Sequence, residues 1–124
     1  MLPTHKSDIA AVEEIARKPA QILVPEIPKL MVWLQDGNWP VAMPIANLLA
    51  GVGEAVIPHV SVVLKGDDPI WKYWCIELLV ARLPRSQVLA LSEELRTLSQ
   101  RPSSAEIAEE VNVAAARELS RVSG

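Results

Sequence analysis

The sequence has 124 residues, half of them hydrophobic, and this length is typical of one domain with a single core. With 12 Lys and Arg against 15 Asp and Glu the net charge is -3, which disfavours binding to nucleic-acid phosphates. One cysteine excludes an internal disulfide, and with only two histidines beside it we expect neither a metal site nor a cofactor.

The beginning of the chain lacks the features of a secretory signal, because no apolar run follows a basic start and Asp8 comes early. Residues 40–64 have the length of a membrane span, but Pro44, Gly51 and Glu54 interrupt them. We therefore expect a cytoplasmic protein that does not enter a membrane, and the single unpaired cysteine agrees with a reducing compartment.

Apolar residues recur every three or four positions along almost the whole chain, which is the period of an α-helix. This pattern predicts an all-α fold of six or seven helices in one domain over residues 1–124. The expected helices cover residues 7–17, 20–35, 40–51, 54–64, 69–83 and 85–99, and a last one begins near 103. Pro25 and Pro28 break the second of these stretches, and Pro25 is expected to open a new helix within it.

Several helix boundaries carry residues that suit them. The expected N-caps are Ser7, Asn38, Asp68 and Ser103. Glu106 stands three positions after the last of these, which is the spacing of a capping box. Gly37 suits the left-handed conformation that ends many helices, so we expect the second helix to stop there.

Two stretches resemble each other at an offset of 30 residues, since Asn38 and Asp68 each precede a Leu-Leu pair at the same distance. A third, incomplete copy begins near residue 103. Such a period predicts a HEAT- or armadillo-like stack of antiparallel helix pairs, which uses extended surfaces to bind partners. The alternative is an irregular helical bundle in which the two Leu-Leu pairs coincide by chance.

Two tryptophan-rich motifs are distinctive: Trp-Leu-x-Asp-x-Asn-Trp-Pro at 33–40 and Ile-Trp-Lys-Tyr-Trp-Cys at 70–75. Together with Ile-Pro-His at 57–59, they resemble an uncharacterised bacterial family of helical proteins of this length, known only as a domain of unknown function. The resemblance covers nearly the whole chain and implies an all-helical, HEAT-like fold. It implies no activity and no catalytic residues.

The repeat places the loop before residue 40 and the loop before residue 70 on the same edge of the expected stack. The candidate partner-binding residues on this edge are Asp36, Asn38, Trp39, Asp67, Asp68, Trp71 and Lys72. Tryptophans anchor many protein interfaces, and carboxylates beside them would add charge. The alternative interpretation is structural, with the polar residues capping helices and the tryptophans buried in the core.

Lys72 lies in the first turns of its helix, where the helix dipole disfavours a cation, so we expect a specific partner for it. Within the chain this partner would be Asp36, Asp67 or Asp68. The alternative is a carboxylate or phosphate supplied by another molecule.

Four other side chains on the apolar helices have potential roles. Glu77 is expected to pair with a cation, and His59 to serve a structural purpose, because no partner acid or nucleophile accompanies it. Cys75 is expected to be a small buried hydrophobe. Trp74 lies in the middle of the most apolar helix, so its replacement by alanine is predicted to cost about 3–5 kcal/mol.

The chain has no phosphate-binding loop, no nucleophile elbow and no zinc-protease motif. We therefore expect a non-catalytic protein-binding domain, for instance a bacterial immunity or accessory protein that binds a toxin domain or another protein partner. The acidic balance suits a basic partner. The alternative is an enzyme or small-ligand-binding protein that uses the corner of Asp36, Trp39, Trp71 and Lys72, and self-association into a homodimer stays open as well.

Overall fold

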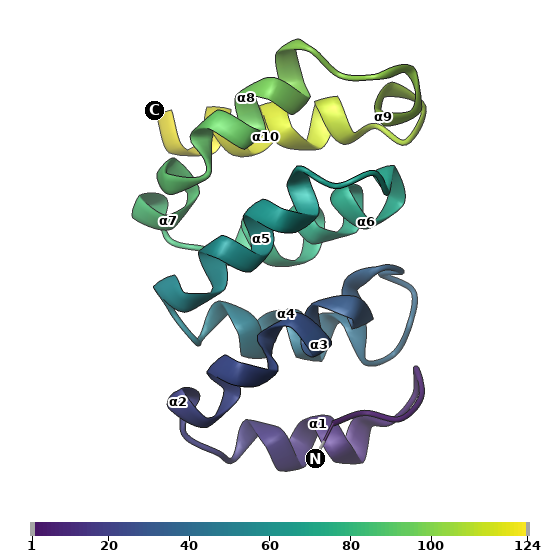
Figure 1. Cartoon of the computed structure of the whole chain (residues 1–124), viewed down its shortest axis with the longest axis vertical. Coiled ribbons are helices and arrows are strands. Elements are labelled where there is room, and N and C mark those ends of the chain that lie inside the picture. Colours follow the sequence, from purple (N-terminus) through teal and green to yellow (C-terminus); the bar gives the residue numbers. More distant parts are fainter. Residues whose placement is uncertain (1, 124) are drawn as a thin grey trace.

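The computed structural model describes residues 2–123, and within them the regular secondary structure consists of helices joined by loops, with no β-strand (Figure 1). The all-α class is therefore confirmed. These residues form nine continuous helical stretches instead of the expected six or seven. The difference arises because the last two expected helices are each divided in two.

The first half of the chain contains α1 (Ile9–Ala16), α2 (Ala20–Leu23), α3 (Ile27–Met31), α4 (Ala42–Ala50) and α5 (Ile57–Leu64). Short 3-10 turns at Val24–Glu26 and Val32–Leu34 extend α2 and α3, and a third at Glu54–Val56 leads into α5. Pro25 and Pro28 explain the first interruption, because proline has no N–H to donate to the α-helical hydrogen-bond pattern.

The second half contains α6 (Pro69–Trp74), α7 (Arg85–Ala90), α8 (Ser92–Gln100), α9 (Ser104–Ala108) and α10 (Val111–Ser123). A π-helical turn at Cys75–Leu79 and a 3-10 turn at Val80–Arg82 continue α6. Leu91 separates α7 from α8, and its side chain is fully buried. Glu110 separates α9 from α10 with a φ of 61°, in the left-handed region.

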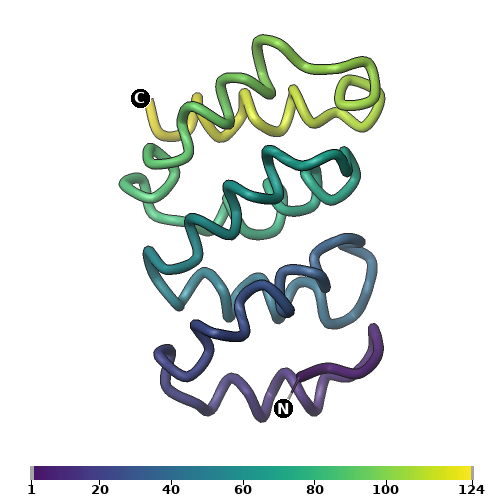
Figure 2. The backbone as a smooth tube through the Cα atoms, in the orientation of Figure 1, coloured from purple at the N-terminus to yellow at the C-terminus, as the bar shows by residue number. Residues whose placement is uncertain are grey.

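The helices are stacked in two layers along the long axis of the molecule (Figures 1 and 2). In the front layer α3 contacts α5, and α5 contacts α8. In the back layer α1 contacts α4, α4 contacts the π-helical turn after α6, and that turn contacts α10. The two stretches that resemble each other in sequence thus occupy successive positions in the back layer, and α10 takes the next one.

The core lies between the two layers, and every α-helix except α6 and α9 contributes buried hydrophobic residues to it. From α6 the partly buried Trp71, Tyr73 and Trp74 pack against it. The largest fully buried side chains are Ile15, Ile27, Leu30, Met31, Leu34, Ile45, Leu49, Ile76, Leu79, Leu83, Leu91 and Leu95. Burial of each such side chain stabilises the fold by about 1.5–3 kcal/mol. These residues fix the positions of the helices whose outer surfaces are described below.

Gly37 does not adopt the left-handed conformation that the sequence suggested; within residues 2–123 the glycine with a positive φ is Gly53. The structure gives a different reason for glycine at position 37. The indole of Trp74 packs directly against this backbone, and a Cβ atom here would come within 3.0 Å of three ring atoms. The loop before α4 is therefore held against α6 by a contact that only glycine permits.

Two of the expected N-caps are wrong. Asp8, not Ser7, caps α1, since its carboxylate accepts a hydrogen bond from the N–H of Ala11. Asn38 caps no helix: its own N–H donates to Oδ1 of Asp36 at 2.8 Å, and α4 begins four residues later without a side-chain cap. The carboxylate of Asp36 stabilises a tight turn, and this turn delays the start of α4.

The other two expected caps are confirmed. Oδ1 of Asp68 accepts a hydrogen bond from the N–H of Trp71 at 3.1 Å, and Pro69 occupies the first position of α6. Ser103 and Glu106 form a capping box at α9, in which each side chain accepts a hydrogen bond from the backbone N–H of the other.

None of the helices described in residues 2–123 is by itself long and apolar enough to cross a membrane. Ala42–Ala50 and Glu54–Leu64 together meet the criteria of length and composition, but the two parts meet at a bend of 120°.

Candidate functional site

The loops before α4 and before α6 lie on one edge of the stack, together with α9 (right-hand side of Figure 1). This edge carries the exposed side chains of Asn38, Asp67 and Asp68 and the partly exposed Asp36 and Trp39. The position is the one that the repeat predicts. Trp71 and Lys72 follow in the first turn of α6, where they point to different neighbours.

Trp39 packs edge-to-face against Trp33, with the ring centroids 5.8 Å apart. Both indoles are partly exposed and both pack against the core. This pair joins the turn after α3 to the start of α4. Trp39 thus has a structural contact as well as an exposed surface, so both interpretations drawn from the sequence apply to it.

Trp71 is directed toward the front layer, where its indole N–H donates to the carbonyl of Met31 at 3.1 Å. Its ring lines an apolar pocket of about 140 Å³ between α3 and α5. The other lining residues are Pro28, Met31, His59, Val62 and Val63. The hydrogen bond fixes the indole, so this wall of the pocket is formed in advance.

The sequence suggested Asp36, Asp67 or Asp68 as the partner of Lys72, but the structure pairs Lys72 with none of these three residues. Its Nζ donates to Oε2 of Glu106 on α9, at 2.5 Å. The side chains of the two residues are 7% and 12% exposed, so this ion pair is largely buried. The paired carboxylate explains why a cation is tolerated in the first turn of α6, because its attraction at this short distance outweighs the unfavourable helix dipole.

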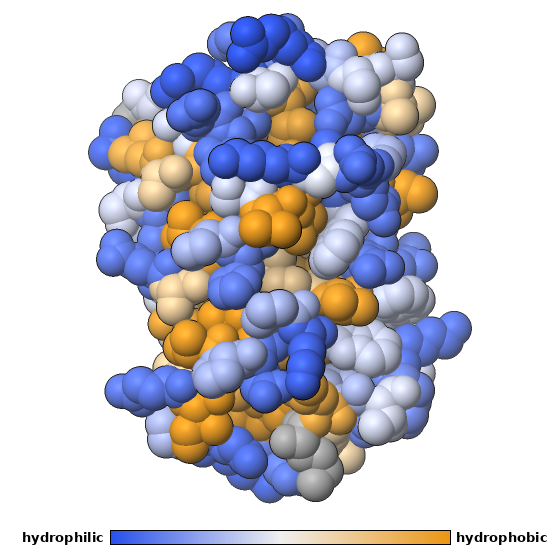
Figure 3. All heavy atoms as spheres, viewed as in Figure 1, coloured by the Kyte–Doolittle hydropathy of each residue, from blue (hydrophilic) through white to orange (hydrophobic). Residues whose placement is uncertain are grey.

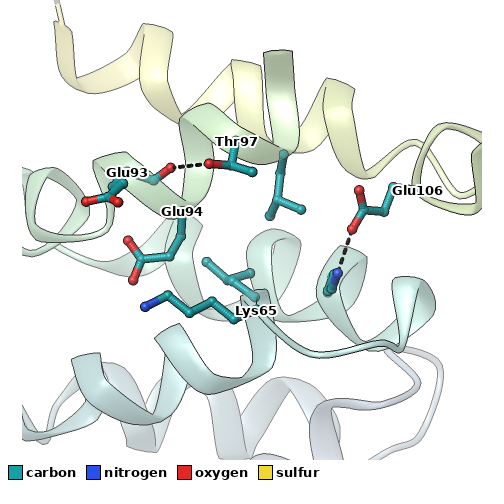
Figure 4. Close-up of a pocket in the computed structure, with 8 residues that line it drawn as sticks. Lys65, Glu93, Glu94, Thr97 and Glu106 are labelled. Atoms are coloured by element: carbon teal, nitrogen blue, oxygen red, sulfur yellow. Dashed lines mark hydrogen bonds and ion pairs between the residues drawn. The ribbon is translucent and has the colours of Figure 1, made fainter. Parts of the chain in front are cut away.

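The ion pair lies at the side of a pocket of about 320 Å³ between α5 and α8 (Figure 4). Leu64 and Leu98 provide apolar walls, and Lys65, Glu93, Glu94 and Thr97 provide polar ones. In Figure 4, the side chains of Lys65 and Glu94 point toward one another. The pocket therefore combines an apolar lining with charges of both signs.

Glu94 is held in place by Ser61 of α5, whose hydroxyl donates to Oε2 at 2.5 Å. One turn away, the hydroxyl of Thr97 donates to the carbonyl of Glu93 at 3.1 Å. The first contact crosses from α5 to α8 and sets the width of the pocket on that side. The second contact involves only the main-chain carbonyl of Glu93, and the carboxylate of this residue is exposed to solvent.

Two opposing effects act on the carboxyl of Glu106. Burial alone would raise its pKa, but the hydrogen bond from Lys72, the N–H of Ser103 and the charge of Lys72 outweigh burial. The pKa of Glu106 is therefore lower than usual. The folded state favours the ionised carboxylate, and the ion pair is formed throughout the neutral range.

We expect the stabilising effect of Glu106 to be complete above about pH 5 and to disappear as the pH falls below the usual glutamate pKa of about 4.3. The sign follows from the lowered pKa, because the unfolded state takes up the proton first as the solution is acidified. Urea unfolding of the wild type and of Glu106→Gln, measured from neutral pH down to about pH 3, checks this. A difference between them that stays constant with pH would contradict it.

Asp67 and Lys72 line a second polar pocket, of about 310 Å³, between the start of α6 and α9. Lys72 therefore separates two pockets and lines both of them. Asp68 acts as the cap of α6. Trp39, Trp71 and Lys72 contact three different partners. The side chains of the corner proposed for a small ligand therefore do not come together at one point.

Glu77 and Cys75 both have structural roles in the fold. Glu77 pairs with Arg117 at 2.7 Å, which agrees with the expected cationic partner. Cys75 is fully buried, and burial raises the pKa of its thiol to about 12, so it is protonated and unreactive at neutral pH. Within residues 2–123, no three His, Cys, Asp or Glu side chains come together in a way that would hold a metal ion.

The comparison with known families covers nearly the whole chain. The family described as Domain of unknown function (DUF5071) matches residues 1–119. The chain belongs to this family. None of the curated proteins matches this DUF5071 chain in sequence, so the roles of its residues rest on its own geometry.

Sequence reasoning did not find Val62, Glu93, Glu94 or the second role of Glu106. Val62 had a detectable signal, because it is an apolar residue that falls off the buried stripe of α5. The two glutamates in the first turn of α8 look like ordinary partners of a helix dipole. The capping box already explained Glu106, so nothing in the pattern indicated an ion pair with a residue 34 positions earlier.

Proposed function

We propose that this DUF5071 chain is a non-catalytic protein-binding domain, built as a HEAT/armadillo-like stack of antiparallel helix pairs. Its binding face is the outer surface of α3, α5 and α8, which we call the front face. Stacked helix pairs present continuous surfaces of this kind, and partners bind along them. The function is of the type that a bacterial immunity or accessory protein performs in the cytoplasm.

The observation that carries this proposal is the exposure of Val62 beside a preformed apolar pocket. Val62 is 70% exposed, more than any other large hydrophobic residue in the described part of the chain. A single exposed valine is ordinary. This one borders the pocket that Trp71 and Met31 line, so a partner side chain can contact all three at once. Anchoring pockets of this kind dominate the energetics of interfaces.

The rest of the front face supports the same interpretation. Figure 3 shows this side of the molecule, where hydrophobic residues form a broken band between hydrophilic ones. Protein interfaces have such an arrangement, with apolar contacts surrounded by a polar rim. Of the seven residues expected from the sequence to bind a partner, Trp71 and Lys72 line pockets beside α5. Asp36, Asn38, Trp39, Asp67 and Asp68 lie on the adjoining edge.

The test uses Val62→Asp, which places a charge at the apolar pocket without touching the core. The chain is co-expressed with the product of the neighbouring gene, and the affinity of the purified complex is measured by calorimetry. We expect binding at least about tenfold weaker for the variant, equivalent to about 1.4 kcal/mol.

Val113→Asp is the matched control, because Val113 is an exposed valine on α10 in the back layer. It should bind as the wild type does, and circular dichroism should show both variants folded. Failure of the wild type to form any complex, or equal affinity of the two variants, would sink the proposal.

A further inference from the structure

We infer that the pocket between α5 and α8 receives a lysine or arginine side chain of the partner, next to the apolar residue that occupies the pocket at Val62. This inference rests on the proposed function and specifies the chemistry of the partner segment. It follows from three features: the charges around the pocket, the free donors of Lys72 and the positions of the two pockets on either side of α5.

The charges favour a cation. Lys72 and Glu106 neutralise each other. The remaining charged residues of the pocket lining are the two carboxylates of Glu93 and Glu94 and the single ammonium of Lys65, so the lining has an excess of negative charge. Within residues 2–123, neither of these two glutamates has a cationic nitrogen within 4.0 Å. A guanidinium or ammonium entering the pocket meets two carboxylates from one turn of α8. Charge-assisted hydrogen bonds of this type are about twice as strong as neutral ones.

Lys72 indicates that the ligand is a polypeptide segment and not a simple cation. Its ammonium has three N–H donors, and one of them is used by Glu106. The side chain is only 7% exposed, yet it lines the pocket, so a bound segment would shield the remaining donors from water. An acceptor oxygen on the same ligand is then needed, because unpaired buried donors are costly. A main-chain carbonyl beside a basic side chain provides it.

The positions of the pockets fix the spacing of the partner residues. Val63 lines the apolar pocket and the next residue, Leu64, lines the charged one, so the two pockets flank α5. Packed helices lie about 8–10 Å apart. Two side chains that enter both pockets are then about three residues apart in a polyproline II segment, in which every third side chain points the same way, or about seven apart along a helix.

The test is selection of a random-peptide library, displayed on phage, against the full chain. We expect the selected peptides to share an apolar residue and a lysine or arginine at one of these two spacings. A synthetic copy of one selected peptide is then titrated against the variant Glu93→Gln with Glu94→Gln. We expect at least about tenfold weaker binding, and a loss of affinity for the wild type at high salt.

The matched control is Glu13→Gln with Glu14→Gln, a pair of adjacent exposed glutamates on α1 in the back layer, which should leave the affinity unchanged. Peptides whose binding is lost with Val62→Asp but does not depend on Glu93 and Glu94 would overturn this inference and leave the proposed face standing. Peptides that bind Val62→Asp as well as the wild type, or no selected peptide at all, would overturn both.

Discussion

Replacement of Lys72 by methionine is expected to lower the free energy of unfolding by about 3 kcal/mol, measured by urea denaturation. The methionine fills a similar volume, so the loss reports the charge and not a cavity. It leaves the Glu106 carboxylate, 12% exposed, without its counter-charge. Breaking one side of a buried ion pair typically costs about 3–5 kcal/mol, and the residual exposure of Glu106 places this pair at the lower end.

A double-mutant cycle separates the ion pair from other effects of the substitutions. Glu106→Gln removes the charge but keeps an acceptor for the N–H of Ser103, so the capping box is retained. We expect Lys72→Met with Glu106→Gln to lose clearly less stability than the sum of the two single variants. Additive losses would show that the two side chains act independently, contrary to the contact at 2.5 Å.

Replacement of Trp74 by alanine is expected to cost about 3 kcal/mol, at the lower end of the range for large aromatic residues because the indole is partly exposed. The ring contacts the backbone of Gly37 on one side and the ring of Tyr73, 5.0 Å away, on another. Thermal unfolding followed by circular dichroism measures the loss. A cost below about 1 kcal/mol, typical of surface positions, would contradict the packing described here.

The partner of this contact can be tested from the other side. Gly37→Ala should destabilise the wild type by about 1–3 kcal/mol through overpacking, but have little effect once Trp74 is replaced by alanine. Gly51→Ala is the control, since its Cβ would meet the nearest carbonyl at 3.4 Å, an ordinary contact. If Gly37→Ala costs no more than Gly51→Ala, the indole does not explain the glycine.

The sequence predicted most of the helical stretches because prolines and the apolar period are local signals. Pro69 marked the start of α6, and the capping box of Ser103 and Glu106 marked α9. The divisions at Leu91 and Glu110 were missed because the period continues across them. At those two positions the tertiary packing of α10 against α8 and α9 prevails over local preference.

The parts of the site that were not predicted depend on residues far apart in the chain. Lys72 finds its partner 34 positions away, and Gly37 is required by a tryptophan 37 positions away. A single sequence has no signal for such pairs, because many aspartates and glutamates are equally plausible partners for one lysine. The edge that carries Asp36, Asp67 and Asp68 was placed correctly, since the repeat fixes the positions of whole helices.

The order of helices in each layer follows the order of the chain, from α1 to α10 (Figure 2). Each helix therefore packs against its neighbours in the chain or against a helix about one repeat away, as in the contact of Lys72 with Glu106 over 34 positions and of Trp71 with Met31 over 40. No contact of this kind requires the two ends of the chain to meet, and the entropy of loop closure grows only slowly with loop length, so this order of packing favours fast folding. Little unprotected surface persists during folding, which limits the time available for aggregation.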